Sequence, residues 1–166
     1  MFKMKIKFII IIITIAFFDL LTKSLSFSYV KDFAINNNLQ FPIVKITDFF
    51  NLVIVWNKGV SFGMFNNFDH AKYFIFLINI LIIICLFFWL FKNSKKYIDF
   101  SLSFIIGGAF GNLIDRAVNG AVADFLDFHL FGYHWPAFNL ADSFVFIDVF
   151  MLMFEYQFTK NDKKNN

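Results

Sequence analysis

The chain has 166 residues, of which 59% are hydrophobic and 16% are charged. A soluble domain of this size could not bury so large an apolar fraction, so the composition excludes that class and favours a polytopic membrane protein. The formal net charge is only +3, and no block of basic residues alternates with aromatic ones, so we expect no nucleic-acid partner.

Four apolar segments each approach the roughly 20 residues that a helix needs to cross the hydrocarbon core. They cover residues from about 6–27, 71–91, 98–118 and 140–158. We therefore predict an all-α polytopic membrane protein with four transmembrane helices, built as a single membrane-embedded domain over residues 1–166.

The segment 28–70 between the first two spans is too long for a simple linker. Its stretch "NLVIVWN" alternates in part and is rich in Val and Ile, which is typical of a β-strand, and "FPIVKITDFF" is a second candidate. We expect these strands to form a small β-sheet on the outer membrane surface. The tail over about 159–166 is polar and is expected to be disordered.

Lysines define the orientation of the spans. By the positive-inside rule, both termini and the short loop after the second span face the cytoplasm, and segments 28–70 and 119–139 face outward. The start of the chain also fits a cleaved signal peptide, but no A-x-A site follows "FIIIIITIAFF", so an uncleaved helix is favoured. The lysines concerned are Lys3, Lys5, Lys7, Lys92, Lys95, Lys96, Lys160, Lys163 and Lys164.

Ionisable residues are rare inside membrane spans, and here they gather in the outer halves of the spans, with little beyond Asp99 and Glu155 in the cytoplasmic half. Asp19 and Lys23 are four residues apart, so they share one face of the first helix. The other polar residues at this depth are Asn112, Asp115, Arg116, Asp124, Asn139 and Asp142.

Each of these residues also has an interpretation that needs no chemistry. Asn139 fits the N-cap of the last helix, with Asp142 in its first turn, where the helix dipole favours a carboxylate. Asp124, taken alone, is typical of a solvated loop residue. The remaining charged residues fit ion pairs, namely Asp19 with Lys23 and Asp115 with Arg116.

Other features of the spans predict packing. Gly107, Gly108 and Gly111 include a G-x-x-x-G spacing, which is typical of close contact between helices. Asn79 lies in the middle of the second span and is expected to hydrogen-bond to another helix. Cys85 lies inside an apolar run and is expected to be a buried, inert thiol.

Two carboxylates that converge in a poorly hydrated site cannot both ionise easily, so one of them holds a proton near neutral pH. That arrangement suits an aspartic protease, in which one carboxylate activates water and the other polarises the peptide carbonyl. A metal site built from Asp124, His129, His134 and Asp142 is an alternative, although the chain lacks a spacing such as H-E-x-x-H. A proton-coupled transporter or channel is another, but it calls for polar residues through the full depth of the membrane.

Five short motifs, in order along almost the whole chain, resemble those of the lipoprotein signal peptidase family, the type II signal peptidases of bacteria. They are "DLLTKS" at 19–24, "NKGVSFG" at 57–63, "GGAFGNLIDR" at 107–116, "VADF" at 122–125 and "PAFNLADS" at 136–143. Val60, Ser61 and Ala123 depart slightly from the usual pattern of the family.

The resemblance implies an intramembrane aspartic endopeptidase of the bacterial inner membrane that cuts diacylglyceryl-modified prolipoproteins before the lipidated cysteine. It implies membrane lipid and prolipoproteins as partners, a monomer, and no metal or cofactor. It places the catalytic pair on Asp124 and Asp142. Supporting or substrate-binding roles fall on Asp19, Lys23, Asn57, Gly59, Asn112, Asp115, Arg116, Asn139 and Ala141.

Overall fold

The computed structural model describes residues 2–59 and 71–162. Within them the chain forms the helices α1 (Phe2–Asn36), α2 (Ala71–Lys92), α3 (Lys96–Asn119) and α4 (Leu140–Asp162). Three helical stretches in this part of the chain are long and apolar enough to cross a membrane: Lys5–Asn36, Lys72–Lys92 and Lys96–Asn119. The predicted fourth span is helical, and its crossing of the membrane stays a prediction. The helix also includes 159–162, the start of the tail that was expected to be disordered.

The first helix is longer than the predicted span over 6–27. It has 35 residues, because the sequence from Ser28 to Asn36 contains neither Gly nor Pro to end it. Asn38 then adopts a left-handed conformation with φ 51°, and the amide of Leu39 donates to the carbonyl of Ala34. The segment 28–70, which was predicted to face outward, therefore begins as a helical extension of α1.

Glycines on α3 allow α1 and α4 to approach closely, as the G-x-x-x-G spacing predicted. A Cβ atom on Gly107 would lie 2.8 Å from the Cβ of Ile15 on α1. A Cβ on Gly108 would lie 2.8 Å from the carbonyl oxygen of Ala141 on α4. Since neither neighbour can move away easily, these contacts require glycine.

The second helix leaves most of its large apolar side chains exposed, as expected of a surface that meets lipid. Cys85 lies on this surface and is exposed, so the prediction of a buried thiol is wrong. Asn79 has a buried Nδ2 without a hydrogen-bond partner among the described residues, so the predicted bond to another helix is not seen there.

A buried ion pair joins the start of α1 to the first turn of α3, next to the connection between α2 and α3. Lys5 Nζ lies 2.6 Å from Asp99 Oδ2 and donates to the carbonyl of Asn93 at 2.9 Å. Both charged side chains are at most 3% exposed. The amino end of α1 and the α2–α3 connection thus lie on the same side of the helical bundle, as the lysine pattern predicts for two cytoplasmic segments.

The strands β1 (Ile43–Lys45), β2 (Phe50–Asn57), β3 (Val122–Leu130) and β4 (Tyr133–His134) form one antiparallel sheet in the order β1-β2-β3-β4. The first two were predicted. The third was not, since the segment 119–139 was expected to be an outer loop. Leu52 pairs with Leu126 and Val55 with Asp124, so β2 carries one extra residue at this point, next to Asp124.

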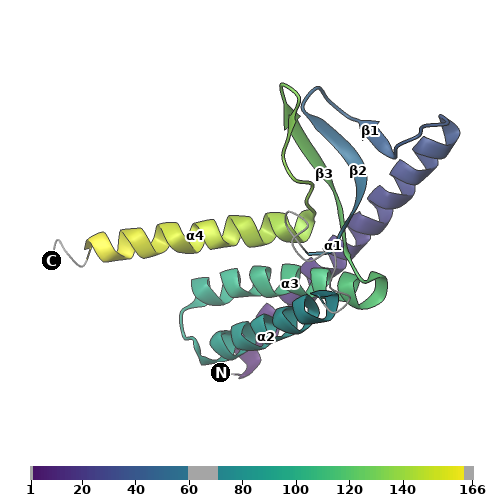
Figure 1. Ribbon diagram of the computed structural model, residues 1–166. Coiled ribbons are helices and arrows are strands. Elements are labelled where there is room, and N and C mark those ends of the chain that lie inside the picture. The colour runs from purple at the N-terminus through teal and green to yellow at the C-terminus, as the bar shows by residue number, and fades with distance from the viewer. Residues whose placement is uncertain (1, 60–70, 163–166) are drawn as a thin grey trace.

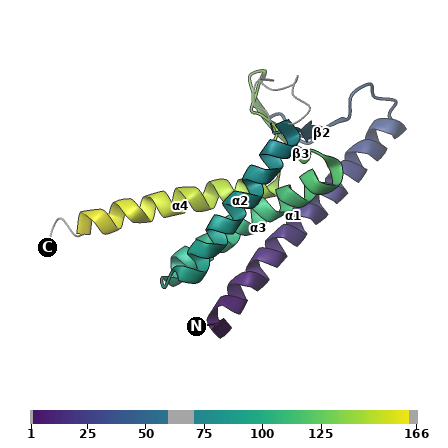
Figure 2. The same ribbon diagram turned by 60° about the horizontal axis from the view of Figure 1, so that its bottom comes forward.

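The sheet stands at one end of the helices (Figure 1), at the carboxyl end of α3 and the amino end of α4. The helices α1, α2 and α3 run side by side, whereas the carboxyl-terminal part of α4 leaves them in both views (Figures 1 and 2). The foot of the sheet, α3 and the start of α4 therefore meet at one place, where the polar residues of the sequence motifs gather.

Candidate active site

Asp124 lies on β3 and is only 1% exposed. Its Oδ2 accepts a hydrogen bond from Asn57 Nδ2 on β2 at 2.9 Å. Its Oδ1 accepts one from Asn139 Nδ2 at 2.7 Å, because Phe138 is hydrogen-bonded to Leu126 and brings the chain before α4 alongside β3. Asp124 is therefore a buried strand residue, and the expectation of a loop position is wrong.

Burial raises the pKa of Asp124 to about 6. The hydrogen bonds from Asn57 and Asn139 act in the opposite direction, while the charge of Asp142 adds to the increase. Burial outweighs the amides because removing a carboxylate from water penalises the charged form. The group thus holds its proton at a higher pH than an ordinary aspartate does.

Asn139 caps α4, as predicted, and Asp142 occupies the first turn of that helix. The side-chain oxygen of Asn139 accepts from the amide of Asp142 at 3.0 Å. Asp142 Oδ1 in turn accepts from Asn112 Nδ2 on α3 at 2.9 Å. The carboxylate of Asp142 therefore lies at the positive end of the helix dipole and is held by an amide of α3.

Two amides connect the two carboxylates. Asn139 Nδ2 lies 3.2 Å from Asn112 Oδ1, so the fully buried Asn139 touches both Asp124 and Asn112. Asn112 then reaches Asp142. The structure therefore brings together Asp124 and Asp142, which lie on different elements, through a short chain of hydrogen bonds.

Lys23 is the cation at the centre of the supporting residues. Its Nζ lies 2.6 Å from Asp19 Oδ2 and 2.9 Å from Asp115 Oδ2, and it donates to Asn112 Oδ1 at 2.8 Å. The ion pair of Asp19 with Lys23 was predicted. The expected partner of Asp115 was Arg116, but Lys23 is the cation that contacts it.

Asp19 and Asp115 also fix the backbone just before each of the two central aspartates. Asp19 Oδ1 accepts from the amide of Ala141 at 2.9 Å, one residue before Asp142. Asp115 Oδ2 accepts from the amide of Ala123 at 3.1 Å, one residue before Asp124. The carboxylate of Asp19 fits there because Gly111 has no side chain in its place. These two acids have a positioning role that their sequence spacing did not reveal.

Asn57 and Gly59 form a tight turn beside Arg116. Asn57 Oδ1 accepts from the amide of Gly59 at 2.7 Å, and Gly59 has φ +81°. A Cβ atom added to Gly59 would lie 3.5 Å from Arg116 Nη2, so the backbone of this turn runs close to the guanidinium group. Arg116 Nε is buried and has no hydrogen-bond partner among the described residues. The rest of this motif, including Val60 and Ser61, lies outside the described residues.

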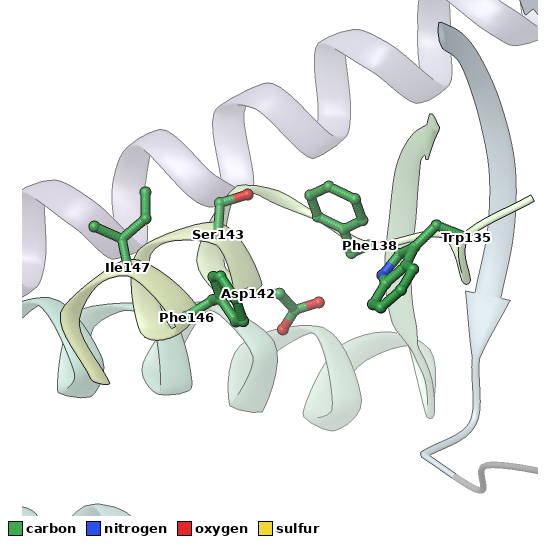
Figure 3. Close-up of a pocket in the computed structure, with 6 residues that line it drawn as sticks. All are labelled: Trp135, Phe138, Asp142, Ser143, Phe146 and Ile147. Atoms are coloured by element: carbon green, nitrogen blue, oxygen red, sulfur yellow. The ribbon is translucent and has the colours of Figure 1, made fainter. Parts of the chain in front are cut away.

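An apolar groove opens onto Asp142. It has a volume of about 400 Å³ and lies between the chain before α4 and the first turns of that helix. Figure 3 shows the carboxylate of Asp142 between the rings of Trp135 and Phe146. Apart from Asp142, the groove residues were not predicted, since nothing in the sequence distinguishes its aromatic residues in a chain with 29 Phe. Its lining residues are Trp135, Phe138, Asp142, Ser143, Phe146 and Ile147.

His129 and His134 do not join this site. His134 Nδ1 lies 2.9 Å from Asp127 Oδ1, and the rings of His129 and His134 stack with centroids 4.8 Å apart. Burial acts to raise the pKa of Asp127, but hydrogen bonds from Asn51 and His134 outweigh it and leave that pKa below its usual value. Across residues 2–59 and 71–162, no three His, Cys, Asp or Glu side chains are placed to hold a metal ion, so the alternative metal set is not assembled.

The architecture is that of a membrane enzyme. The chain superposes on a solved bacterial membrane enzyme with a TM-score of 0.74 at 28% sequence identity, covering 96% of this chain and 93% of that one. A second solved structure, also described as a bacterial membrane enzyme, gives a TM-score of 0.72 at 28% identity and covers 90% of this chain and 92% of that one. Together with its apolar helices, this likeness identifies the class as an integral membrane enzyme.

The chain belongs to the signal peptidase II family, whose model, described as signal peptidase (SPase) II, matches residues 11–158. It is 42% identical over 151 residues to the lipoprotein signal peptidase of Rickettsia conorii, covering 90% of this chain and 72% of that protein. It is 40% identical over 161 residues to that of Francisella tularensis subsp. novicida, covering 94% of each. The resemblance inferred from the five motifs is confirmed, and family membership makes the protein a peptidase.

Proposed function

We propose that this protein is an intramembrane aspartic endopeptidase that removes the signal peptide from diacylglyceryl-modified bacterial prolipoproteins, cutting before the lipidated cysteine. The observation that carries the proposal is the connection of Asp124 to Asp142 through Asn139 and Asn112. Two carboxylates held in different environments are what an aspartic peptidase needs. Membership of the signal peptidase II family supports the choice of substrate.

The two aspartates divide the chemistry. Asp142 is the general base, since its carboxylate opens onto the apolar groove and is held by Asn112 at the start of α4. Asp124 carries the proton, since burial raises its pKa to about 6. Asp142 takes a proton from a water molecule, and the water oxygen bonds to the carbonyl carbon while Asp124 polarises the carbonyl oxygen.

The tetrahedral intermediate then collapses. The bond between carbon and nitrogen breaks, and a proton from the carboxyl pair passes to the leaving amine of the cysteine. The products are a signal peptide with a new carboxylate and a lipoprotein with a free amino group. Arg116 supports the reaction by donating to a substrate carbonyl, since its Nε is buried beside the acids and has no partner within the described part of the chain.

The groove beside Asp142 suits an apolar substrate that arrives from the bilayer. Trp135, Phe138, Phe146 and Ile147 supply apolar walls, and the carboxylate of Asp142 lies between them (Figure 3). An acyl chain or an apolar side chain next to the scissile bond can pack here while the peptide bond reaches the carboxylates. Ser143 is not free to act as a nucleophile in this arrangement, because its Oγ donates to the carbonyl of Asn139 at 3.0 Å.

The proposed location is the bacterial inner membrane, with both termini in the cytoplasm and the carboxylates near the outer face. The contact of Lys5 with Asn93 supports it, since it places the amino end of α1 beside the lysine-rich α2–α3 connection. Lys23 and Asp115 meet toward the opposite ends of α1 and α3. A monomer supplies every residue of the proposed site.

The proposal is tested by mapping the product. Purified protein in detergent or liposomes should convert a diacylglyceryl-modified prolipoprotein to a product whose amino-terminal residue is the lipidated cysteine, as read by mass spectrometry. The same precursor with an unmodified cysteine should be cut much more slowly. Equal cutting of both precursors, or cutting elsewhere, contradicts the substrate assignment. Proton or solute flux through liposomes without cleavage would favour the transporter alternative.

A further inference from the structure

The turn between β3 and β4 places an aromatic ring on an unfavourable backbone. Leu130 pairs with Tyr133, so Phe131 and Gly132 form a two-residue turn. Both have positive φ angles, 50° and 81°. Such turns favour Asn followed by Gly, and a bulky side chain at positive φ is uncommon. The side chain of Phe131 is 99% exposed, so packing within the described protein does not account for it.

Four large apolar side chains are exposed around this turn, beside His134, which pairs with Asp127. Tyr133 and Trp135 are exposed along with Phe131 and Leu130, and these four residues are called here the hairpin surface. Residues 128–138 contain no Asp, Glu, Lys or Arg. Tyr and Trp are the residues that concentrate at the membrane–water interface, where one end of the ring is apolar and the other is hydrated.

The neighbouring turn of the sheet differs in carrying charged side chains, although Ile46 and Phe49 are exposed there as well. It joins β1 to β2 and carries the exposed ion pair of Lys45 with Asp48, whose charged atoms are 2.7 Å apart. The amide of His129 donates to the carbonyl of Phe49, so the two turns lie at the same end of the sheet. Two adjacent turns that differ so strongly in charge indicate different surroundings.

The uncharged turn is on the side of the sheet that faces α4. Figure 1 shows the β3 edge of the sheet toward α4 and the β1 edge on the opposite side, toward the end of α1. Trp135 belongs both to the hairpin surface and to the apolar groove beside Asp142. The hairpin surface is therefore continuous with the apolar groove and, through it, with the exposed apolar face of α4, including Phe146.

We infer that the hairpin surface inserts into the lipid–water interface of the outer leaflet and anchors the free end of the sheet to the bilayer. The turn with Lys45 and Asp48 stays in water above it. Lipid contact gives Phe131 the apolar surroundings that the folded chain does not provide. The anchor also keeps the groove beside Asp142 open toward the acyl chains, and it does not depend on which reaction the carboxylates perform.

Spin labelling of the full-length protein in liposomes of phosphatidylcholine and phosphatidylglycerol tests the inference. Cys85→Ala removes the native thiol, and Phe131→Cys or Asp48→Cys then carries the label on one turn or the other. We expect the label at position 131 to be severalfold more accessible to oxygen than to a water-soluble nickel complex, and the label at position 48 to show the reverse. Tyr133→Cys, outside the turn itself, should match position 131 and so excludes an effect of altering the turn.

Three outcomes would overturn the inference. Access of the nickel complex to positions 131 and 133 equal to that at position 48 places the hairpin surface in water. Protection from both reagents that disappears as the protein is diluted in lipid shows that a second copy covers it. Access of nickel that is lost only when a prolipoprotein is added shows that the occupant is substrate. Because no cleavage is measured, these outcomes are independent of the proposed reaction.

Discussion

Asp124→Asn and Asp142→Asn should each abolish cleavage of a lipidated prolipoprotein while the protein still accumulates in the membrane. Loss of a general acid or base costs about 10²- to 10⁴-fold in rate. Asparagine keeps the shape of aspartate, and the bond from Asn112 to Oδ1 of residue 142 can persist. A time course of precursor and product, with the amount of membrane protein measured in parallel, checks the prediction.

Two further aspartates serve as controls. Asp127 is also buried on β3 but bonds to Asn51 and His134, so Asp127→Asn should leave the rate within a few-fold of the original. Asp115→Asn keeps the oxygen that can accept from Ala123, so it should slow cleavage less than either central variant. If Asp124→Asn cuts normally and Asp115→Asn does not, the assignment of the pair is wrong.

Lys23→Met should destabilise the folded protein by about 3–5 kcal/mol, because it leaves uncompensated buried charge. Lys23 is the cation that contacts both Asp19 and Asp115, and all three side chains are at most 7% exposed. Since those acids hold the backbone before Asp142 and Asp124, cleavage should fall as well. Thermal unfolding in detergent, with the cleavage rate of the protein that remains folded, measures both effects.

The matched control for Lys23 is Lys45, which forms an exposed ion pair with Asp48. Lys45→Met should change the stability by no more than about 1 kcal/mol, as is usual for surface pairs. The double variant Lys23→Met with Asp115→Asn should recover part of the lost stability, because one of the stranded charges is gone. Unfolding of Lys23→Met at the temperature of the original protein would show that the buried cluster does not need its cation.

Local sequence patterns predicted the elements that depend on near neighbours. The helices follow from apolar length, the cap of α4 from Asn139, and the close approach of α3 to its neighbours from Gly107 and Gly108. The strands β1 and β2 follow from their Val- and Ile-rich alternation. In each case the residues that determine the structure lie within a few positions of one another.

Contacts between distant parts of the chain were not predictable in the same way. The strand β3 carries aspartates and a histidine where a strand pattern calls for apolar residues, and pairing with β2 overrides that local signal. The pairing of Lys23 with Asp115, and of Lys5 with Asp99, depends on which faces of α1 and α3 meet. By charge alone, Arg116 is as suitable a partner for Asp115 as Lys23, so the sequence could not decide between the two cations.

The groove and the hairpin surface were hidden by composition. The chain contains 29 Phe residues, so Phe131, Phe138 and Phe146 look ordinary in the sequence. Phe131 stands out by its exposure in a turn, and Phe138 and Phe146 line the groove together with Asp142, as Figure 3 shows. One signal was available, since residues 128–138 have no charged side chain while the segments on both sides do.

The pH dependence of kcat/KM on a lipidated prolipoprotein tests the shared proton of Asp124 and Asp142 most directly. Burial raises the pKa of Asp124 to about 6. Below that pH Asp124 holds the proton that the mechanism requires, and above it the proton is lost. We therefore predict a bell-shaped profile whose alkaline limb falls with an apparent pKa near 6 that belongs to the pair. A rate that instead rises steadily from pH 6 to pH 8, as a histidine-activated nucleophile gives, would contradict the account.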